Sequence, residues 1–171
     1  LYAWRGDGET ALSVYSQFVW ANFKEQTFTQ MNAVLYLWYL EVAGIDVGGL
    51  WEDVASFIEA NKAYEDHLSP YIQVIFVYAL YRSGKKEIAK STLKLMKSYG
   101  EKQKGAVNHH IWCDVAVPML EGCMLFADGL YKEASQKLKD IVDDNVSVAL
   151  GHSDEQRFMF YQTYLVSLLK A

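Results

Sequence analysis

The amino-acid sequence predicts an all-α protein of about eight helices, in which antiparallel helix pairs stack into a right-handed α-solenoid. Three observations support this fold class. Apolar residues recur every three or four positions along most of the 171 residues, which is the spacing of a helix face buried in a core. No alternating apolar and polar run bounded by turn residues predicts a strand. A glycine–alanine pattern also recurs along the chain, as stacked helix pairs require.

The composition fits a single helical domain spanning residues 1–171. Apolar residues make up 51% of the chain and charged residues 22%, which excludes an intrinsically disordered protein. The net charge of -5 argues against general attraction to nucleic acid. Two cysteines cannot form a disulfide scaffold and fit a reducing compartment, so we expect a cytoplasmic protein. Because the chain starts at Leu1 inside an apolar pattern, we expect it to be a fragment of a longer solenoid.

Breaks in the apolar spacing separate the expected helices. The two most apolar segments between breaks, Ala33–Ala43 and Tyr71–Tyr81, are interrupted by Glu41 and Gln73. Both are shorter than the roughly 20 residues that cross a bilayer, so we expect buried core helices and no membrane span. The breaks contain glycine or clustered polar residues and lie at Gly6–Gly8, Lys24–Gln26, Gly44–Gly49, Lys62–Ser69, Ser83–Lys85, Gly100–Gly105, Asp128–Gly129 and Asp143–Ser153.

Three local signals fix helix boundaries. Ser69 followed by Pro70 predicts a helix start, since serine can cap and proline fits the first turn. Ser153 with Gln156 forms a capping-box pattern ahead of the last helix. Pro118 lies within an apolar helical run, so we expect a kink there or a helix that begins near it.

The repeat begins with glycine, followed by alanine five residues later and by large residues four and then three positions further on. Glycine permits the tight turn between antiparallel helices, alanine lies where they approach closely, and the large residues fill the space between pairs. With Gly44 ending a fourth similar helix, the glycines are 38, 40 and 45 residues apart. This exceeds the roughly 34 residues of a regular tetratricopeptide repeat, so we interpret the copies as degenerate tetratricopeptide-like repeats. An unrelated helical bundle is the alternative. The three copies are Gly6-Ala11-Tyr15-Phe18, Gly84-Ala89-Leu93-Met96 and Gly129-Ala134-Leu138-Ile141.

Three segments resemble the tetratricopeptide repeat protein 38 family. Leu35–Trp51 has its apolar helix with an acidic residue, a glycine-rich turn and a tryptophan, and Glu65–His67 has its acidic pair followed by histidine. Gly151–Gln162 resembles a further family segment, although His152 and Phe158 replace a family glycine and aspartate. The order and spacing match the C-terminal part of such a protein. The resemblance implies an α-solenoid of tetratricopeptide type and no particular reaction.

The candidate partner-binding residues are aromatic or basic side chains of the first helix in each pair, which lines the concave face of tetratricopeptide arrays. Tryptophan, tyrosine and arginine are enriched at binding hot spots. Burial of the same aromatics against a neighbouring or missing helix is the alternative, and the sequence leaves it open. The candidates are Trp38, Tyr71, Tyr78, Tyr81, Arg82 and Phe126.

We therefore expect a non-catalytic scaffold that binds a protein or peptide segment, without a cofactor. We also expect the N-terminal end to expose apolar surface and to self-associate or pack against a missing domain. An accessory region of a larger enzyme is one alternative. Another is an adaptor for RNA or acidic lipid, based on one stripe of lysines, although a solvated helix face is the favoured interpretation of such a stripe. The stripe consists of Lys86, Lys90, Lys94 and Lys97.

No catalytic or metal-binding residue is predicted. His109 and Cys113 have the spacing of two ligands on one helix face, but no third ligand is evident nearby. Cys113 has no obvious paired base and is interpreted as a buried thiol. Arg157 in the last helix is expected to pair with an acidic neighbour.

Overall fold

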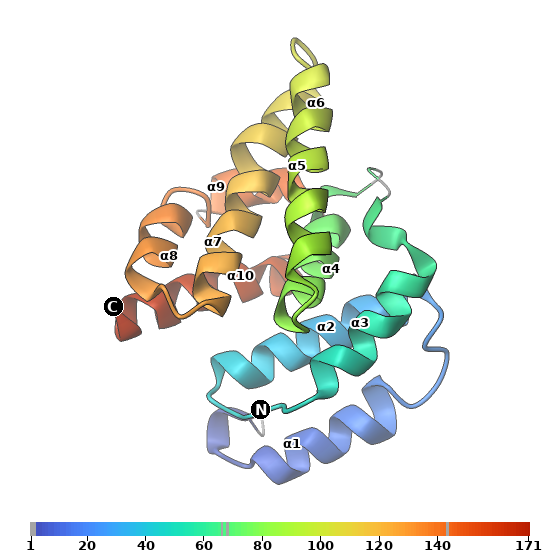
Figure 1. Cartoon of the computed structure of the whole chain (residues 1–171). Helices are drawn as coiled ribbons and strands as arrows, with labels where there is room; N and C mark the ends of the chain where they lie inside the picture. The colour runs from blue at the N-terminus through green and yellow to red at the C-terminus, as the bar shows by residue number, and fades with distance from the viewer. Residues whose placement is uncertain (1–2, 66, 68, 143) are drawn as a thin grey trace.

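The computed structural model describes residues 3–65, 67, 69–142 and 144–171, and this part of the chain is helical and contains no strand (Figure 1). The π-helical segment η2 continues α1, and the π-helical segment η4 leads into α7. With each continuous helix counted once and single turns left out, the described residues form eight long helical segments. The all-α prediction is therefore confirmed. The elements are η1 Ala3–Arg5, α1 Gly8–Val14, η2 Tyr15–Val19, α2 Thr27–Val42, α3 Leu50–Asn61, η3 Ala63–Glu65, α4 Pro70–Arg82, α5 Lys86–Lys102, α6 Val107–His110, η4 Ile111–Ala116, α7 Val117–Ala127, α8 Tyr131–Leu138, α9 Asp144–Ser147, η5 Val148–Leu150 and α10 Asp154–Lys170.

Both predicted helix starts are confirmed. The Ser69 hydroxyl accepts a hydrogen bond from the backbone N–H of Ile72, and Pro70 occupies the first turn of α4. Ser153 and Gln156 form a reciprocal capping box at the start of α10. Each bond satisfies a backbone or side-chain group that the first turn would otherwise leave unpaired.

Pro118 changes the type of helix but does not interrupt it, since Val107–Ala127 is one continuous helix. A proline lacks an N–H and crowds the carbonyl four residues earlier, and the wider π-turn of η4 directly precedes it. By length and composition alone this helix could cross a bilayer, although 56% of its most apolar window is buried among the other helices. A core helix meets the same test, so this is weak evidence for a span.

The glycines of the repeat make the expected turns. Gly6, Gly44, Gly84 and Gly129 have φ values between 76° and 84°, a left-handed conformation that other residues rarely adopt. The alanines five residues after three of these glycines are at most 1% exposed. The turn role predicted for the glycines is therefore confirmed, and the alanines lie in the core.

Helix α4 lies at the centre and packs against α2, α3, α5 and α7. Successive helices pair as α2 with α3, α4 with α5, and α7 with α8. At one end α1–η2 packs on α2, and at the other α5 and the start of the α6–α7 helix project together (Figure 1). The last helix, α10, folds back onto α8, α2 and α7. One hydrophobic cluster runs through the described residues, from Ala11 in α1 to Phe160 in α10.

Candidate binding groove

The aromatic residues predicted to bind a partner are buried. Trp38, Tyr71 and Tyr78 have no exposed surface, while Tyr81 is 6% and Phe126 is 8% exposed. A partner cannot reach these side chains in the folded chain. The prediction that they line an open surface is therefore wrong, and the core alternative agrees with the structure.

The stacked rings of Trp38 and Tyr78 show how repeat positions meet in this core. Trp38 precedes Gly44 by six residues, and Tyr78 precedes Gly84 by six. Their ring centroids are 3.7 Å apart and nearly parallel. Cys123 occupies the same position before Gly129 and is also fully buried. Equivalent positions in the first helices of neighbouring repeats thus pack on one another. This packing buries the residues that sequence spacing assigned to a groove.

Helix α10 covers these aromatic residues from the other side. The Phe160 ring meets Trp38 and Tyr71 edge-on, with centroids 5.8 Å away in each case. The hydroxyls of Tyr39 and Tyr71 donate to backbone carbonyls in the first turn of α10, at 2.9 and 3.1 Å. The concave surface predicted for a partner is therefore occupied by the C-terminal helix of the chain itself.

Arg82 is paired within the fold. Its guanidinium forms two hydrogen bonds with the Glu41 carboxylate, one of them 3.0 Å from Nε to Oε2. Nearby, the Asp128 carboxylate accepts from the Tyr81 hydroxyl at 2.6 Å and from Lys86 at 2.7 Å. Burial raises the pKa of Asp128, but these two bonds outweigh it and hold that pKa below its usual value of 3.8. Both ion pairs hold helices together.

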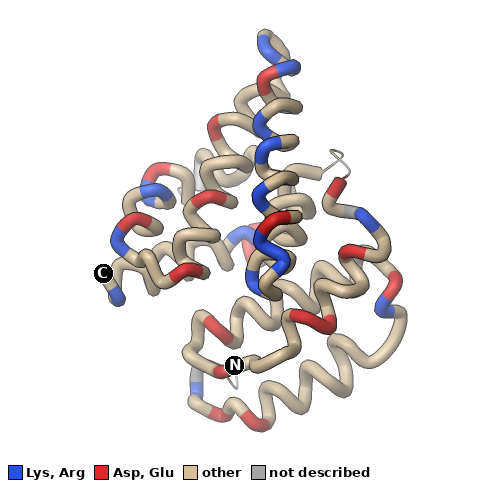
Figure 2. The backbone as a smooth tube through the Cα atoms, viewed as in Figure 1, with Lys and Arg blue, Asp and Glu red and all other residues tan. Residues whose placement is uncertain are grey.

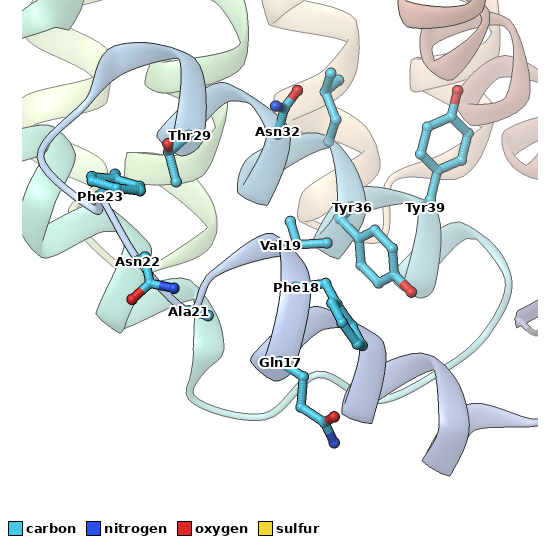
Figure 3. A pocket seen from close by; sticks show the side chains of 11 residues that line it. Gln17, Phe18, Val19, Ala21, Asn22, Phe23, Thr29, Asn32, Tyr36 and Tyr39 are labelled. Atoms are coloured by element: carbon cyan, nitrogen blue, oxygen red, sulfur yellow. The ribbon is translucent and has the colours of Figure 1, made fainter.

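An open groove lies instead between η2 and α2, with a volume of about 710 Å³ (Figure 3). Figure 3 shows Phe18 and Val19 of η2 beside Tyr36 of α2, with Phe23 and Thr29 at the other end. Aromatic rings alternate with amide and hydroxyl groups along it. The lining residues are Gln17, Phe18, Val19, Ala21, Asn22, Phe23, Thr29, Asn32, Leu35, Tyr36 and Tyr39.

Three phenylalanines make this end of the molecule apolar. Phe18 is 77% exposed and Phe23 70%, and Phe28, in the first turn of α2, is 66% exposed. Clustered exposed aromatic side chains mark interaction sites in soluble proteins. The expectation of exposed apolar surface at the N-terminal end is confirmed.

The loop that carries Phe23 is fixed on both sides. The Trp20 indole donates to the Asp53 carboxylate at 2.5 Å, and the Gln30 amide donates to the Lys24 carbonyl at 2.9 Å. Between these anchors Phe23 has φ of 56°, a left-handed conformation that is rare for a bulky residue. Such strain persists where the surrounding structure imposes it, and it clusters at functional sites. The groove wall is therefore preorganised.

The lining of the groove is mostly aromatic, aliphatic and amide in character. Among the residues that the structure describes, Tyr36 and Tyr39 are the ionisable side chains that line it. Burial raises the pKa of both phenols, and at Tyr39 the Glu155 carboxylate raises it further. The Tyr36 hydroxyl donates to the Ala11 carbonyl at 3.0 Å, so its ring, rather than its hydroxyl, faces the groove. Acid–base or nucleophilic chemistry needs a group that titrates near neutral pH or an activated nucleophile. The lining offers apolar and amide contacts instead.

Two lysines of the stripe on α5 form close ion pairs with other parts of the fold. Figure 2 shows basic residues along this helix. Lys86 pairs with Asp128, Lys97 with Glu121 at 2.5 Å, and Lys90 lies 3.9 Å from Glu87. The stripe therefore helps to join α5 to its neighbours.

The histidines and cysteines are held in structural contacts. His109 Nδ1 lies 2.8 Å from the Gly100 carbonyl oxygen. Within the described ranges no three His, Cys, Asp or Glu residues lie close enough to hold a metal. Burial raises the pKa of Cys113, helped by Glu101 and Asp114, and burial alone raises that of Cys123. Neither thiol is activated as a nucleophile.

No known family model matches the chain, and no solved structure matches it. The groove therefore has to be interpreted from its own residues. The repeat pattern includes Phe18 only as a space-filling residue, and Phe23 and Phe28 were not among the predicted binding residues. Their signal was present as three phenylalanines in eleven residues on either side of an expected break.

Proposed function

We propose that this chain is a non-catalytic interaction module of stacked helix pairs, and that it binds an amphipathic α-helix of a partner protein in the groove between η2 and α2. One observation carries the proposal: in the following repeats a helix fills the equivalent position. Helix α2 contacts both α3 and α4, and α4 contacts both α5 and α7. The elements α1–η2 and α2 stand one repeat before α3 and α4. The open groove between them corresponds to the position that α2 occupies beside α3 and α4.

The α2 wall supports this equivalence residue by residue. Leu35, Tyr36 and Tyr39 stand nine, eight and five residues before Gly44. Their counterparts before Gly84 are Ile75, Phe76 and Ala79 of α4, and all three have no exposed surface. Tyr36 and Tyr39 are only half-buried. The same face of a first helix is thus covered in the α4 repeat and partly open in the α2 repeat.

The η2 wall gives the same result. Phe18 follows Gly6 by twelve residues, as Met96 follows Gly84 and Ile141 follows Gly129. Met96 is 0% and Ile141 8% exposed, whereas Phe18 is 77% exposed. Phe18 lies in the π-helical turn η2 and lines the groove. A bound helix would cover it.

The expected ligand is a helix with one apolar face and no required charge. A helix satisfies its own backbone hydrogen bonds, so it needs mainly apolar contacts from the receptor. The exposed phenylalanines and the rings of Tyr36 and Tyr39 supply these contacts. The amides of Gln17, Asn22 and Asn32 can pair with polar side chains at the edge of the ligand's apolar face. We infer stacking of the tetratricopeptide type, in line with the family resemblance, and a cytoplasmic location.

The test is selection of helical ligands with a matched control surface. A displayed library of amphipathic helical peptides is selected on the native chain. Binding of the enriched peptide is then measured to Phe18→Ser and to Leu95→Ser, since Leu95 is a 57% exposed residue on α5, away from the groove. We expect Phe18→Ser to weaken binding at least tenfold and Leu95→Ser to leave it unchanged, at low and at high salt alike.

Two outcomes would count against the proposal. One is that no helical peptide is enriched above a variant with Phe18→Ser and Phe23→Ser. The other is that binding falls steeply with salt and depends on Lys94, which would favour the lysine stripe and an acidic ligand.

A further inference from the structure

The outer face of α10 is apolar and open to solvent. Facing the core, Met159, Phe160, Thr163 and Ser167 are at most 1% exposed, and the two hydroxyls bond to carbonyls of their own helix. Facing outward are five large apolar residues, and a monomer gains nothing from placing them in water. They are Phe158 at 47%, Tyr161 at 40%, Leu165 at 37%, Leu168 at 49% and Leu169 at 86% exposure.

Four of these residues have coiled-coil spacing. From Phe158 the steps to Tyr161, Leu165 and Leu168 are three, four and three residues, which is the spacing of positions a and d in a heptad repeat. The four side chains therefore form one seam along α10. The rings of Phe158 and Tyr161 already stack, with centroids 5.8 Å apart, so part of the seam is ordered. Such a seam fits against a second helix of similar pattern.

We propose that α10 pairs in antiparallel orientation with α10 of a second copy of this chain, forming a symmetric homodimer. The first turn of α10 carries Asp154 and Glu155, and the last turn carries Lys170. Parallel pairing would place the acidic turns together. Antiparallel pairing keeps the two acidic turns at opposite ends of the interface and opposes the helix dipoles, while Lys170 lies over the Tyr131 ring of its own chain.

The shape of the surface is also self-complementary in this orientation. A two-fold axis midway between Tyr161 and Leu165 sets Phe158 opposite Leu168 of the second copy. Leu169, the most exposed of the five, then points toward a hollow of about 420 Å³ beside Phe158. Val142 and the 53% exposed Val148 line that hollow. Arg157 also lines it, but its guanidinium is paired with Asp154 and the Gly151 carbonyl, so it presents no free charge to an incoming leucine.

Sedimentation equilibrium over a wide concentration range tests the dimer. We expect a monomer–dimer equilibrium for the native chain. Leu165→Glu and, separately, Tyr161→Lys should each raise the dimer dissociation constant by about a hundredfold, because each buries a charge in the seam. Leu95→Glu on α5 is the matched control, and it should leave the constant unchanged. Circular dichroism establishes that each variant is folded. A native chain that stays monomeric, or a dimer that both seam variants retain, would overturn the proposal.

Disulfide trapping tests the orientation. Phe158→Cys and Leu168→Cys are each prepared with Cys113→Ser, and buried Cys123 stays in place. Under mild oxidation the mixture should form a cross-linked dimer containing one chain of each variant, while each variant alone should not cross-link. Efficient cross-linking of each variant alone would mean parallel helices and contradict the model. Loss of the dimer in a Phe18→Ser, Phe23→Ser variant would place the interface at the groove instead and would also contradict it.

Discussion

Replacing Phe160 with alanine measures how strongly α10 is held on the inner surface. The side chain is 1% exposed and contacts the rings of Trp38 and Tyr71. Loss of its transfer free energy is worth about 2–3 kcal/mol. The cavity left behind and the two edge-to-face contacts bring the expected loss to about 3–5 kcal/mol. Phe158→Ala is a control of the same type, two positions away and 47% exposed. Because its space opens to solvent, we expect a loss of about 1 kcal/mol or less.

The assay is urea unfolding followed by circular dichroism, at concentrations low enough for the chain to be monomeric. A lower midpoint at an unchanged slope would report loss of stability alone. Equal small losses for Phe160→Ala and Phe158→Ala would refute the packing of α10 over the aromatic residues.

Three further outcomes follow from the packing and the titrating groups. Gly122→Ala should lower stability by about 1–3 kcal/mol in thermal unfolding, since an added Cβ would lie 2.6 Å from the Leu138 side chain; an unchanged melting temperature would contradict the close contact of α7 and α8. Because folding lowers the pKa of Asp128, this carboxylate stabilises the fold above its unfolded pKa, and that stability is lost as pH falls through its folded pKa. Asp128→Asn should therefore flatten the dependence of the unfolding free energy on pH below about pH 4. An unaltered dependence would exclude this carboxylate as a source of acid sensitivity. Cys123 should react with a thiol reagent only after unfolding, because it is fully buried, whereas Cys113 is partly exposed; rapid reaction of both in the native chain would show that the core opens.

Local features of the fold could be predicted from the sequence because nearby residues decide them. Ser69, Pro70 and Ser153 act on backbone groups within three residues, and a left-handed turn needs a glycine such as Gly84 wherever it occurs. The pairing of Arg157 with Asp154 is equally local and was also predicted correctly.

The covering of the aromatic surface could not be predicted, because distant contacts decide it. Tyr39 meets the first turn of α10 across 116 residues. No pattern in α10 indicates which surface it covers, since large apolar side chains lie on both of its faces and Thr163 and Ser167 lie on the buried one. Spacing alone correctly grouped Trp38 with Tyr78 but gave no information on what lies above them. The groove was missed because its walls come from two segments separated by a loop.

Amide chemical-shift mapping tests the central claim most directly. The selected helical peptide is titrated into the ¹⁵N-labelled native chain, and perturbed amides are placed on the structure. The account predicts perturbations concentrated at η2, the loop that carries Phe23 and the exposed side of α2, with α5 and the outer face of α10 unaffected. Perturbations centred on α5 or on α10, with Phe18 and Phe23 unaffected, would contradict it.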